Sequence, residues 1–191
     1  MNTLILASSS VFRKQLLKRL QIPFTCTNPD IDETPKQKES APVLVERLAI
    51  EKAIAVAGQY DNHLIIGADQ VALLGDNVLT KPGNIQNASQ QLRLQAGQTL
   101  VFYSGIALYN STTKQCASDV VATEVTFRQL SDDEITRYLE IEKPFNCAGS
   151  FKSEGLGISL FKNIKGPDPT ALVGLPLIRL CEMLRAEGIK I

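Results

Sequence analysis

The chain has 191 residues, the size of one domain, and its 20 Lys and Arg residues balance 20 Asp and Glu residues. This even charge balance argues against a protein whose main role is to bind nucleic acid, because such proteins usually have a strongly basic surface. With 44% hydrophobic and 21% charged residues, the composition is that of a folded globular chain. No apolar run approaches the ~20 residues of a membrane span, and the N-terminus lacks the basic region of a signal peptide. We therefore expect a cytoplasmic protein that does not bind membranes.

The cysteines and the single histidine do not form a recognisable metal or catalytic motif. Cys26, Cys116, Cys147 and Cys181 are scattered along the chain without C-x-x-C spacing, and His63 cannot complete a zinc site with them at a standard spacing. We expect four free thiols in a reducing compartment. His63 would be the base of any Ser-His-Asp triad, but its place in an Asp-Asn-His turn disfavours that mechanism.

The elements predicted in chain order are those of an α/β protein with a mixed sheet. They are a strand at 3–7, a loop and N-cap at 8–10, a helix from Val11 to before Pro23, a loop at 25–41, a helix at 42–58, a strand at 63–71, a helix at 87–96, strands at 100–109 and 119–127 joined by a hairpin turn, a helix at 131–142 opened by a capping box, a strand at 158–161 and a helix at 177–187.

The first candidate site is the turn between the first strand and the first helix. Three serines, Ser8 to Ser10, precede the helix, and Arg13 lies in its first turn. Free backbone N–H groups at a helix N-terminus, serine hydroxyls and a guanidinium together form a phosphate-binding site. Ordinary helix capping with a surface arginine explains the same residues.

The second candidate is a lysine on the apolar face of the helix at 42–58. At about 100° per residue, one arc of this helix carries Leu44, Val45, Leu48, Ala49, Ala55 and Val56, and Lys52 lies in the middle of it. Lys52 either extends its ammonium out to water or points inward towards an anionic partner.

The third candidate is Asp69, at the end of an apolar strand that we expect in the centre of the sheet. Open α/β sheets bind ligands at the carboxyl ends of their strands, and a carboxylate buried there needs a cation or a donor. Asp69 and Glu33 would supply carboxylates, and Arg13, Lys52 and Lys81 would supply cations. This combination suits the cleavage of a polyphosphate with a divalent metal such as Mg²⁺.

Six ordered motifs resemble the Maf family of nucleoside triphosphate pyrophosphatases over essentially the full chain. They are ILASSSxxRxxLL at 5–17, IDETP at 31–35, RLAxEKA at 47–53, IIGADQ at 65–70, LTKP at 79–82 and CAGSF at 147–151. The resemblance implies a single Maf-like domain over 1–191, with an elongated mixed sheet and two lobes around a nucleotide cleft. It also implies hydrolysis between the α- and β-phosphates with Mg²⁺ or Mn²⁺. It assigns phosphate binding to Ser8, Arg13, Lys52 and Lys81, metal binding to Glu33 and Asp69, and the role of proton acceptor to Asp69.

Within this family, the sequence is similar to the YceF-type branch, which prefers 7-methyl-GTP and clears modified nucleotides. The resemblance assigns substrate selection to Phe12, Gln70 and Glu154, and Phe12 replaces the tryptophan usual in this branch. A methylated guanine is cationic, and both an aromatic face and a carboxylate favour a cation. The alternatives are a dTTP/UTP pyrophosphatase of the same family and a nucleotide-gated regulator of cell division. A homodimer is compatible with the sequence.

Overall fold

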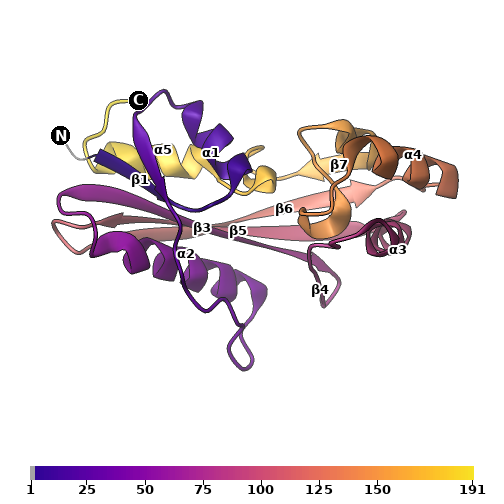
Figure 1. Ribbon diagram of the computed structural model, residues 1–191, viewed down its shortest axis with the longest axis horizontal. Helices are drawn as coiled ribbons and strands as arrows, with labels where there is room; N and C mark the ends of the chain where they lie inside the picture. Colours follow the sequence, from indigo (N-terminus) through magenta and orange to yellow (C-terminus); the bar gives the residue numbers. More distant parts are fainter. Residues whose placement is uncertain (1–2) are drawn as a thin grey trace. The chain divides into compact units, whose positions relative to one another are not determined.

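The computed structural model describes residues 3–191, which fold into a mixed α/β chain (Figure 1). The helices are α1 (Val11–Lys18), α2 (Ala41–Ala57), α3 (Ile85–Gln95), α4 (Asp132–Glu142) and α5 (Leu177–Ala186), and the short 3₁₀ helices are η1 (Ala148–Ser150), η2 (Leu156–Leu160) and η3 (Ala171–Val173). The strands are β1 (Thr3–Ala7), β2 (Phe24–Thr27), β3 (His63–Leu74), β4 (Asn77–Leu79), β5 (Thr99–Asn110), β6 (Cys116–Phe127) and β7 (Phe161–Lys165).

The strands form one mixed sheet, as the sequence predicts. Its order is β2-β1-β3-β5-β6-β7, and β4 pairs with β3. Strand β1 is parallel to both β2 and β3, whereas β3 with β4 and β6 with β7 are antiparallel. The described chain divides into two compact units, the first with residues 3–70, 103–121 and 168–191 and the second with residues 71–102 and 122–167. Strands β3, β5 and β6 contribute residues to both units.

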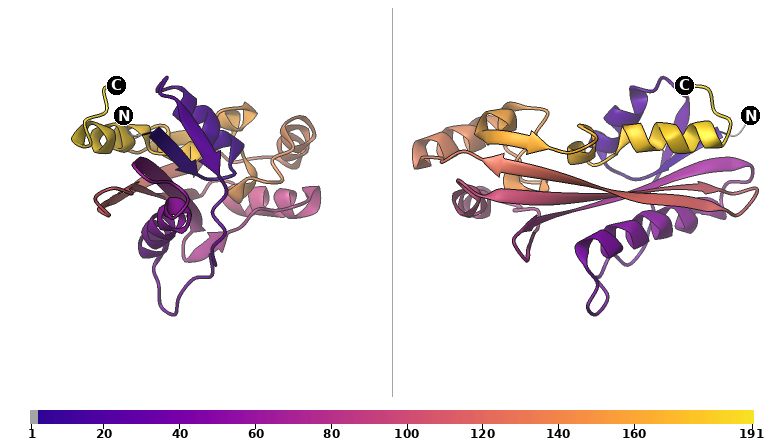
Figure 2. Two further views of the ribbon diagram at one scale, coloured as in Figure 1. Left: turned by 60° about the vertical axis from the view of Figure 1, so that its left-hand side comes forward. Right: turned by 180° about the vertical axis from the view of Figure 1, so that it is seen from behind.

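In the first unit, helices cover both faces of the sheet, with α1 and α5 on one face and α2 on the other (Figures 1 and 2). The alternation of side chains along β1 explains this arrangement. Leu4 and Leu6 pack into a core with Leu16 of α1 and the apolar side of α5, whereas Ile5 and Ala7 pack against α2. Both faces of the strand are buried, so β1 is apolar throughout and not alternating.

Two glycines allow α2 to lie directly against the sheet. A Cβ atom on Gly67 of β3 would lie 1.9 Å from the carbonyl oxygen of Ala49, and one on Gly105 of β5 would lie 2.2 Å from that of Val45. Any larger residue at these positions would therefore push the helix away. The close contact fixes the face of α2 that carries Lys52.

The second unit has its own aromatic core. Phe127 and Phe161 pack edge to face at 5.1 Å between ring centroids, and Phe151 lies 4.9 Å from Phe161 and 5.4 Å from Phe102. The predicted capping box is present at the start of α4, where Ser131 and Glu134 bond each other's backbone N–H groups. Phe151, the last residue of the CAGSF motif, is part of the aromatic core of this unit.

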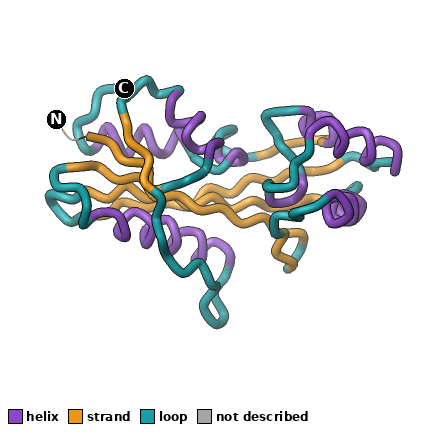
Figure 3. Tube along the Cα trace, in the orientation of Figure 1, coloured by secondary structure: helices purple, strands orange, loops and turns teal. Residues whose placement is uncertain are grey.

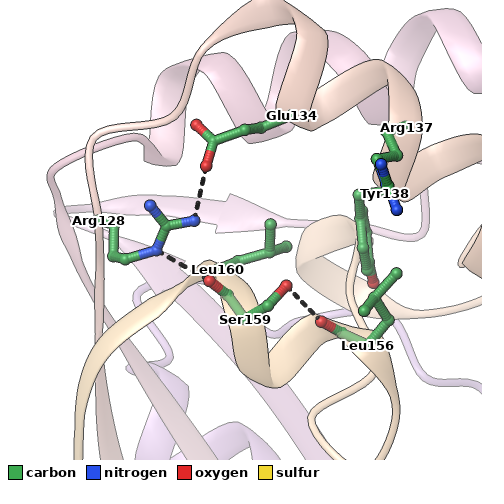
Figure 4. A pocket seen from close by; sticks show the side chains of 7 residues that line it. All are labelled: Arg128, Glu134, Arg137, Tyr138, Leu156, Ser159 and Leu160. Carbon is green, nitrogen blue, oxygen red and sulfur yellow. Dashed lines mark hydrogen bonds and ion pairs between the residues drawn. The ribbon is translucent and has the colours of Figure 1, made fainter.

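A surface pocket of the second unit lies between α4 and η2 (Figure 4). The guanidinium of Arg128 closes one side of it, donating to Glu134 Oε1 at 2.9 Å and to the carbonyl oxygen of Ser159 at 2.8 Å. Arg137, Tyr138, Leu156 and Leu160 complete its lining. None of the residues predicted for the site lines this pocket.

The structure corrects three sequence-based expectations. Residues 158–161 are not a strand, because η2 continues to Leu160 and β7 begins at Phe161. The segment 25–41 is not entirely loop, because strand β2 extends to Thr27. The residues of β2 are only partly buried and show no hydrophobic pattern, so the strand is defined by its backbone pairing with β1. Ala55 is exposed, although the helical arc places it on the buried side of α2.

No helix in residues 3–191 is long and apolar enough to cross a membrane.

Candidate active site

The candidate residues of the first unit gather where the serine turn after β1 meets the middle of β3. Asp69 is not at the end of its strand, where the sequence predicts it, because β3 continues to Leu74. Parallel pairing sets Ala7, the last residue of β1, opposite Gly67, so the serine turn that follows β1 lies beside the part of β3 that carries Asp69. His63 pairs with Thr3 at the other end. Asp69 is six positions along the same strand from His63, a distance of about 20 Å. His63 therefore cannot act together with Asp69 in a Ser-His-Asp triad.

An ion-paired cluster joins α2, β3 and the loop before α2. The ammonium of Lys52 lies 2.6 Å from Asp69 Oδ1 and 2.7 Å from Glu33 Oε1. Lys52 and Asp69 are both buried, whereas the side chain of Glu33 is 59% exposed. Lys52 therefore points inward to anionic partners, and the alternative of an ammonium extended into water is wrong. Its charge compensates the buried carboxylate of Asp69.

The serine turn is a built structure and not a flexible linker. Ser8 is buried, and its Oγ accepts a hydrogen bond from the backbone N–H of Ser10 at 3.1 Å. Ser10 is the N-cap of α1, with its Oγ 3.4 Å from the backbone nitrogen of Arg13. Ordinary capping therefore accounts for Ser10, and the buried hydroxyl of Ser8 is left facing the side chain of Arg13.

Two contacts hold the guanidinium of Arg13 beside this cluster. Its Nε donates to the carbonyl oxygen of Gly174 at 2.9 Å, and its Nη1 lies 3.5 Å from Ser8 Oγ. Burial lowers the pKa of Arg13, while the negative charges of Asp69 and Glu33 oppose that shift. An arginine stays protonated under such conditions. The site thus holds two cations and two carboxylates in one unit.

Gln70 fixes η3 and the following Gly174, the segment to which Arg13 is hydrogen-bonded. Its side-chain nitrogen lies 2.9 Å from Ser104 Oγ and 3.1 Å from the carbonyl oxygen of Leu172, and Ser104 Oγ donates to the carbonyl oxygen of Ala171 at 2.7 Å. Gly174, which follows η3, has φ of 109°, a conformation that favours glycine. Sequence reasoning missed Ser104 and Gly174. The Gly-Leu-Pro step before α5 is the signal that could have indicated a special turn.

A buried carboxylate anchors the other end of this segment. Asp168 is 2% exposed, and it accepts hydrogen bonds from the backbone N–H groups of Thr170 at 2.8 Å and Ile178 at 2.7 Å. Ile178 lies in the first turn of α5, where a negative charge is stabilised by the helix dipole. Asp168 therefore ties η3 to α5, and through Gly174 it supports the position of Arg13.

Arg47 clamps the long loop that carries Glu33. Residues 28–40 of this loop contain no helix or strand (Figure 3). Arg47 of α2 forms a two-pronged ion pair with Glu39, at 2.6 and 2.7 Å, and donates to the carbonyl oxygen of Thr34 at 3.3 Å. These hydrogen bonds lower the pKa of Glu39 to about 2, so its carboxylate stays charged at neutral pH. The clamp holds the backbone next to Glu33.

We expect Arg47→Met to release this loop. Charge-assisted hydrogen bonds to a two-pronged guanidinium are the strong class of hydrogen bond, so their loss should let the loop open more often. Amide hydrogen exchange at Thr34 and Lys36, whose N–H groups bond Asp32 and Glu39, should therefore accelerate measurably. Arg93→Met is the matched control, because Arg93 forms an ion pair on α3 of the other unit. Unchanged exchange in Arg47→Met would contradict the clamp.

The remaining predicted residues lie on α1 and in the second unit. Phe12 is partly exposed in the first turn of α1, next to Arg13. Lys81 and Glu154 are exposed residues of the second unit. The cluster therefore contains Ser8, Arg13, Glu33, Lys52 and Asp69, with Gln70 beside it. The roles of Phe12, Lys81 and Glu154 stay predictions.

The two carboxylates fit a divalent cation that shares its coordination with a substrate. Glu33 and Asp69 direct one oxygen each towards a single point, which the ammonium of Lys52 occupies at 2.7 and 2.6 Å. Among residues 3–191, no group of three or more His, Cys, Asp or Glu side chains could hold a metal. Mg²⁺ commonly takes one or two carboxylates and completes its shell with water and phosphate oxygens.

Comparison with known proteins identifies the family to which this chain belongs. Residues 3–187 match the family model described as Maf-like protein. The 7-methyl-GTP pyrophosphatase of Pseudomonas fluorescens strain Pf0-1 is 52% identical over 188 residues, covering 98% of both chains. That of Pseudomonas aeruginosa strain PAO1 is 52% identical over 191 residues, covering 100% of both.

The fold is shared with solved structures such as the Staphylococcus aureus Ham1 protein. Its TM-score is 0.53 at 15% identity, and the match covers 97% of this chain and 100% of that one. The identity is too low to carry a function. The family assignment rests on the family model and on the relatives that are half identical from end to end, and by both the chain belongs to the Maf family.

Proposed function

We propose that this chain is a metal-dependent pyrophosphatase that hydrolyses 7-methyl-GTP to 7-methyl-GMP and pyrophosphate. The observation that carries the proposal is full-length identity of about half to relatives named 7-methyl-GTP pyrophosphatase. The cluster of Arg13, Lys52, Glu33 and Asp69 supports it, because it contains the charges that this reaction needs. The four free cysteines support a reducing compartment such as the cytoplasm.

In the proposed reaction, a water molecule attacks the α-phosphorus of the nucleotide. The new bond forms between the water oxygen and phosphorus, the bond to the oxygen that bridges the α- and β-phosphates breaks, and pyrophosphate leaves with that oxygen. Asp69 accepts the proton of the water as general base. Arg13 and Lys52 neutralise the charge that develops on the phosphates. A divalent cation held by Glu33 and Asp69 would supply further charge neutralisation and orient the water.

The guanine ring of the substrate would be selected through the positive charge that its methyl group gives it. We propose that Phe12 stacks on the methylated guanine and that Glu154 accepts hydrogen bonds from its N1–H and N2–H₂ edge. The side-chain nitrogen of Gln70 is already bonded to Ser104 and to carbonyl oxygens of η3. Gln70 would therefore act on the substrate through its Oε1 atom or through the position of η3.

We expect kcat/KM for 7-methyl-GTP to exceed that for GTP by well over tenfold. A cation–π contact contributes about 0.5–2 kcal/mol, and a carboxylate partner adds to it. Pyrophosphate release should be measured for 7-methyl-GTP, GTP, dTTP and UTP, with Mg²⁺, Mn²⁺ or EDTA. Glu154→Gln should shrink the ratio and Phe12→Trp should maintain or widen it, whereas Glu140→Gln, which alters an exposed residue of α4, should leave it unchanged.

Each other outcome of these assays would assign a different function or specificity to this chain. Comparable rates for 7-methyl-GTP, GTP and UTP would reject the base-recognition model and keep the pyrophosphatase. Fast hydrolysis of dTTP and UTP alone would assign the chain to the other branch of the family. Tight nucleotide binding without turnover would favour a nucleotide-gated regulator, and full activity in EDTA would reject the requirement for a metal.

A further inference from the structure

The ammonium of Lys52 occupies the point at which the two candidate metal ligands converge. It lies 2.6 Å from Asp69 Oδ1 and 2.7 Å from Glu33 Oε1, and we call this point the bridging position. The side chain of Lys52 is only 7% exposed. The close packing of α2 against Gly67 keeps the root of the side chain near β3. The bridging position is therefore filled by a cation of the protein itself.

A divalent cation would need the same two oxygens. Mg²⁺ binds oxygen at about 2.0–2.1 Å, so an ion bound to both carboxylates would come within a few ångströms of the present ammonium. Two cations at such a separation repel each other strongly in a partly buried site. Lys52 and a metal cannot both occupy the bridging position. One must move when the other enters.

We propose that Lys52 competes with the metal for the two carboxylates. Its ammonium holds the bridging position until a metal–nucleotide complex arrives, and the side chain then moves so that the ammonium pairs with the phosphates. This inference rests on the proposed function, because it requires a polyphosphate substrate. A lysine suits the role, since its ammonium sits on a flexible four-carbon stem and is not bound to one planar geometry.

Charge compensation explains why the exchange would require the nucleotide. In the free protein, Lys52 neutralises the carboxylates, and a metal that displaced it would leave an ammonium without a partner in a largely buried place. The phosphates of a bound nucleotide remove this penalty, because they accept the ammonium and also supply ligands to the metal. The free protein should therefore bind divalent cations weakly, and the metal should enter together with the substrate.

The test is a titration of the nucleotide-free protein with Mn²⁺, in which binding is measured from the electron paramagnetic resonance signal of unbound Mn²⁺. We expect Lys52→Met to bind Mn²⁺ at least tenfold more tightly than the parent, although its hydrolysis of 7-methyl-GTP is impaired. Lys52→Gln should behave in the same way, and it guards against a failure of the methionine variant to fold. In thermal unfolding, Mn²⁺ should raise the Tm of both variants more than that of the parent.

Arg13→Met is the matched control for a general effect of charge. Arg13 is a cation near the same carboxylates, but it bonds Gly174 and Ser8 and does not bridge the carboxylates. Its removal should tighten Mn²⁺ binding less than threefold. The double variant Lys52→Met, Asp69→Asn should lose the gain, which would locate the bound ion at the bridging position.

Equal Mn²⁺ affinity in the parent and both Lys52 variants would overturn the proposal, as would an equal gain in Arg13→Met. The proposed function fails separately, through the absence of pyrophosphate release from 7-methyl-GTP by the parent. A parent that hydrolyses the substrate but binds free Mn²⁺ as tightly as Lys52→Met would therefore refute the competition alone.

Discussion

Asp69→Asn should lower kcat for 7-methyl-GTP hydrolysis by about 10²–10⁴-fold, the usual contribution of a general base. The amide keeps the size of the side chain and can still accept a hydrogen bond from Lys52, which lies 2.6 Å from Oδ1. It cannot accept the proton of the attacking water, and it is a poor ligand for a divalent cation. The loss should therefore appear in the chemical step and persist at saturating Mg²⁺ or Mn²⁺.

The fold should survive this substitution. Lys52 keeps Glu33 as a partner at 2.7 Å, so its ammonium is not left without an anion. Denaturant unfolding followed by circular dichroism should show a cooperative transition for the variant. Asp61→Asn is the matched control, because Asp61 is exposed in the turn before the same strand. Activity of Asp69→Asn within about tenfold of the parent would refute the role of Asp69 as base.

The sequence predicts the components of the cluster better than their connections. Strand β1 and the start of α1 follow from an apolar run and an N-cap. The apolar strand that carries Asp69 lies inside the sheet as predicted, but Asp69 is in the middle of that strand and not at its end. Helical periodicity places Lys52 on the buried face of α2, but it cannot identify a partner. That partner, Glu33, lies in a loop without periodicity, and the ion pair with Arg47 that anchors this loop depends on tertiary contact.

The contacts that orient Arg13 and Gln70 join residues far apart in the chain. Arg13 bonds Gly174, and Gln70 bonds the backbone of η3 about a hundred residues further on. Such hydrogen bonds leave no local pattern, since each partner is an ordinary residue in its own segment. For the same reason β2 escaped prediction: its four residues are recognised by pairing with β1 and not by their own hydrophobicity.

Arg13→Ala should lower kcat/KM for 7-methyl-GTP by about 10²-fold or more, the scale expected when a preorganised donor to a developing negative charge is removed. The contacts with Gly174 and Ser8 hold Nε and orient Nη1, so N–H groups on both Nη atoms remain to bind phosphate oxygens. Alanine removes the charge and leaves the carbonyl oxygen of Gly174 without this donor. Arg13→Lys should recover little, because an ammonium cannot bond Gly174 and two phosphate oxygens in the same planar arrangement.

The control for Arg13→Ala is Lys14→Ala, which removes a neighbouring exposed cation from the same helix. Its kcat/KM should stay within about twofold of the parent at physiological salt, because screening weakens the effect of an exposed charge. If Arg13 acts mainly on the transition state, kcat should fall with kcat/KM, whereas a role limited to substrate binding would raise KM and leave kcat unchanged. Equal behaviour of the two alanine variants would show that the anchored guanidinium has no special part in hydrolysis, and the phosphate site would then have to be sought at Lys52 and Lys81.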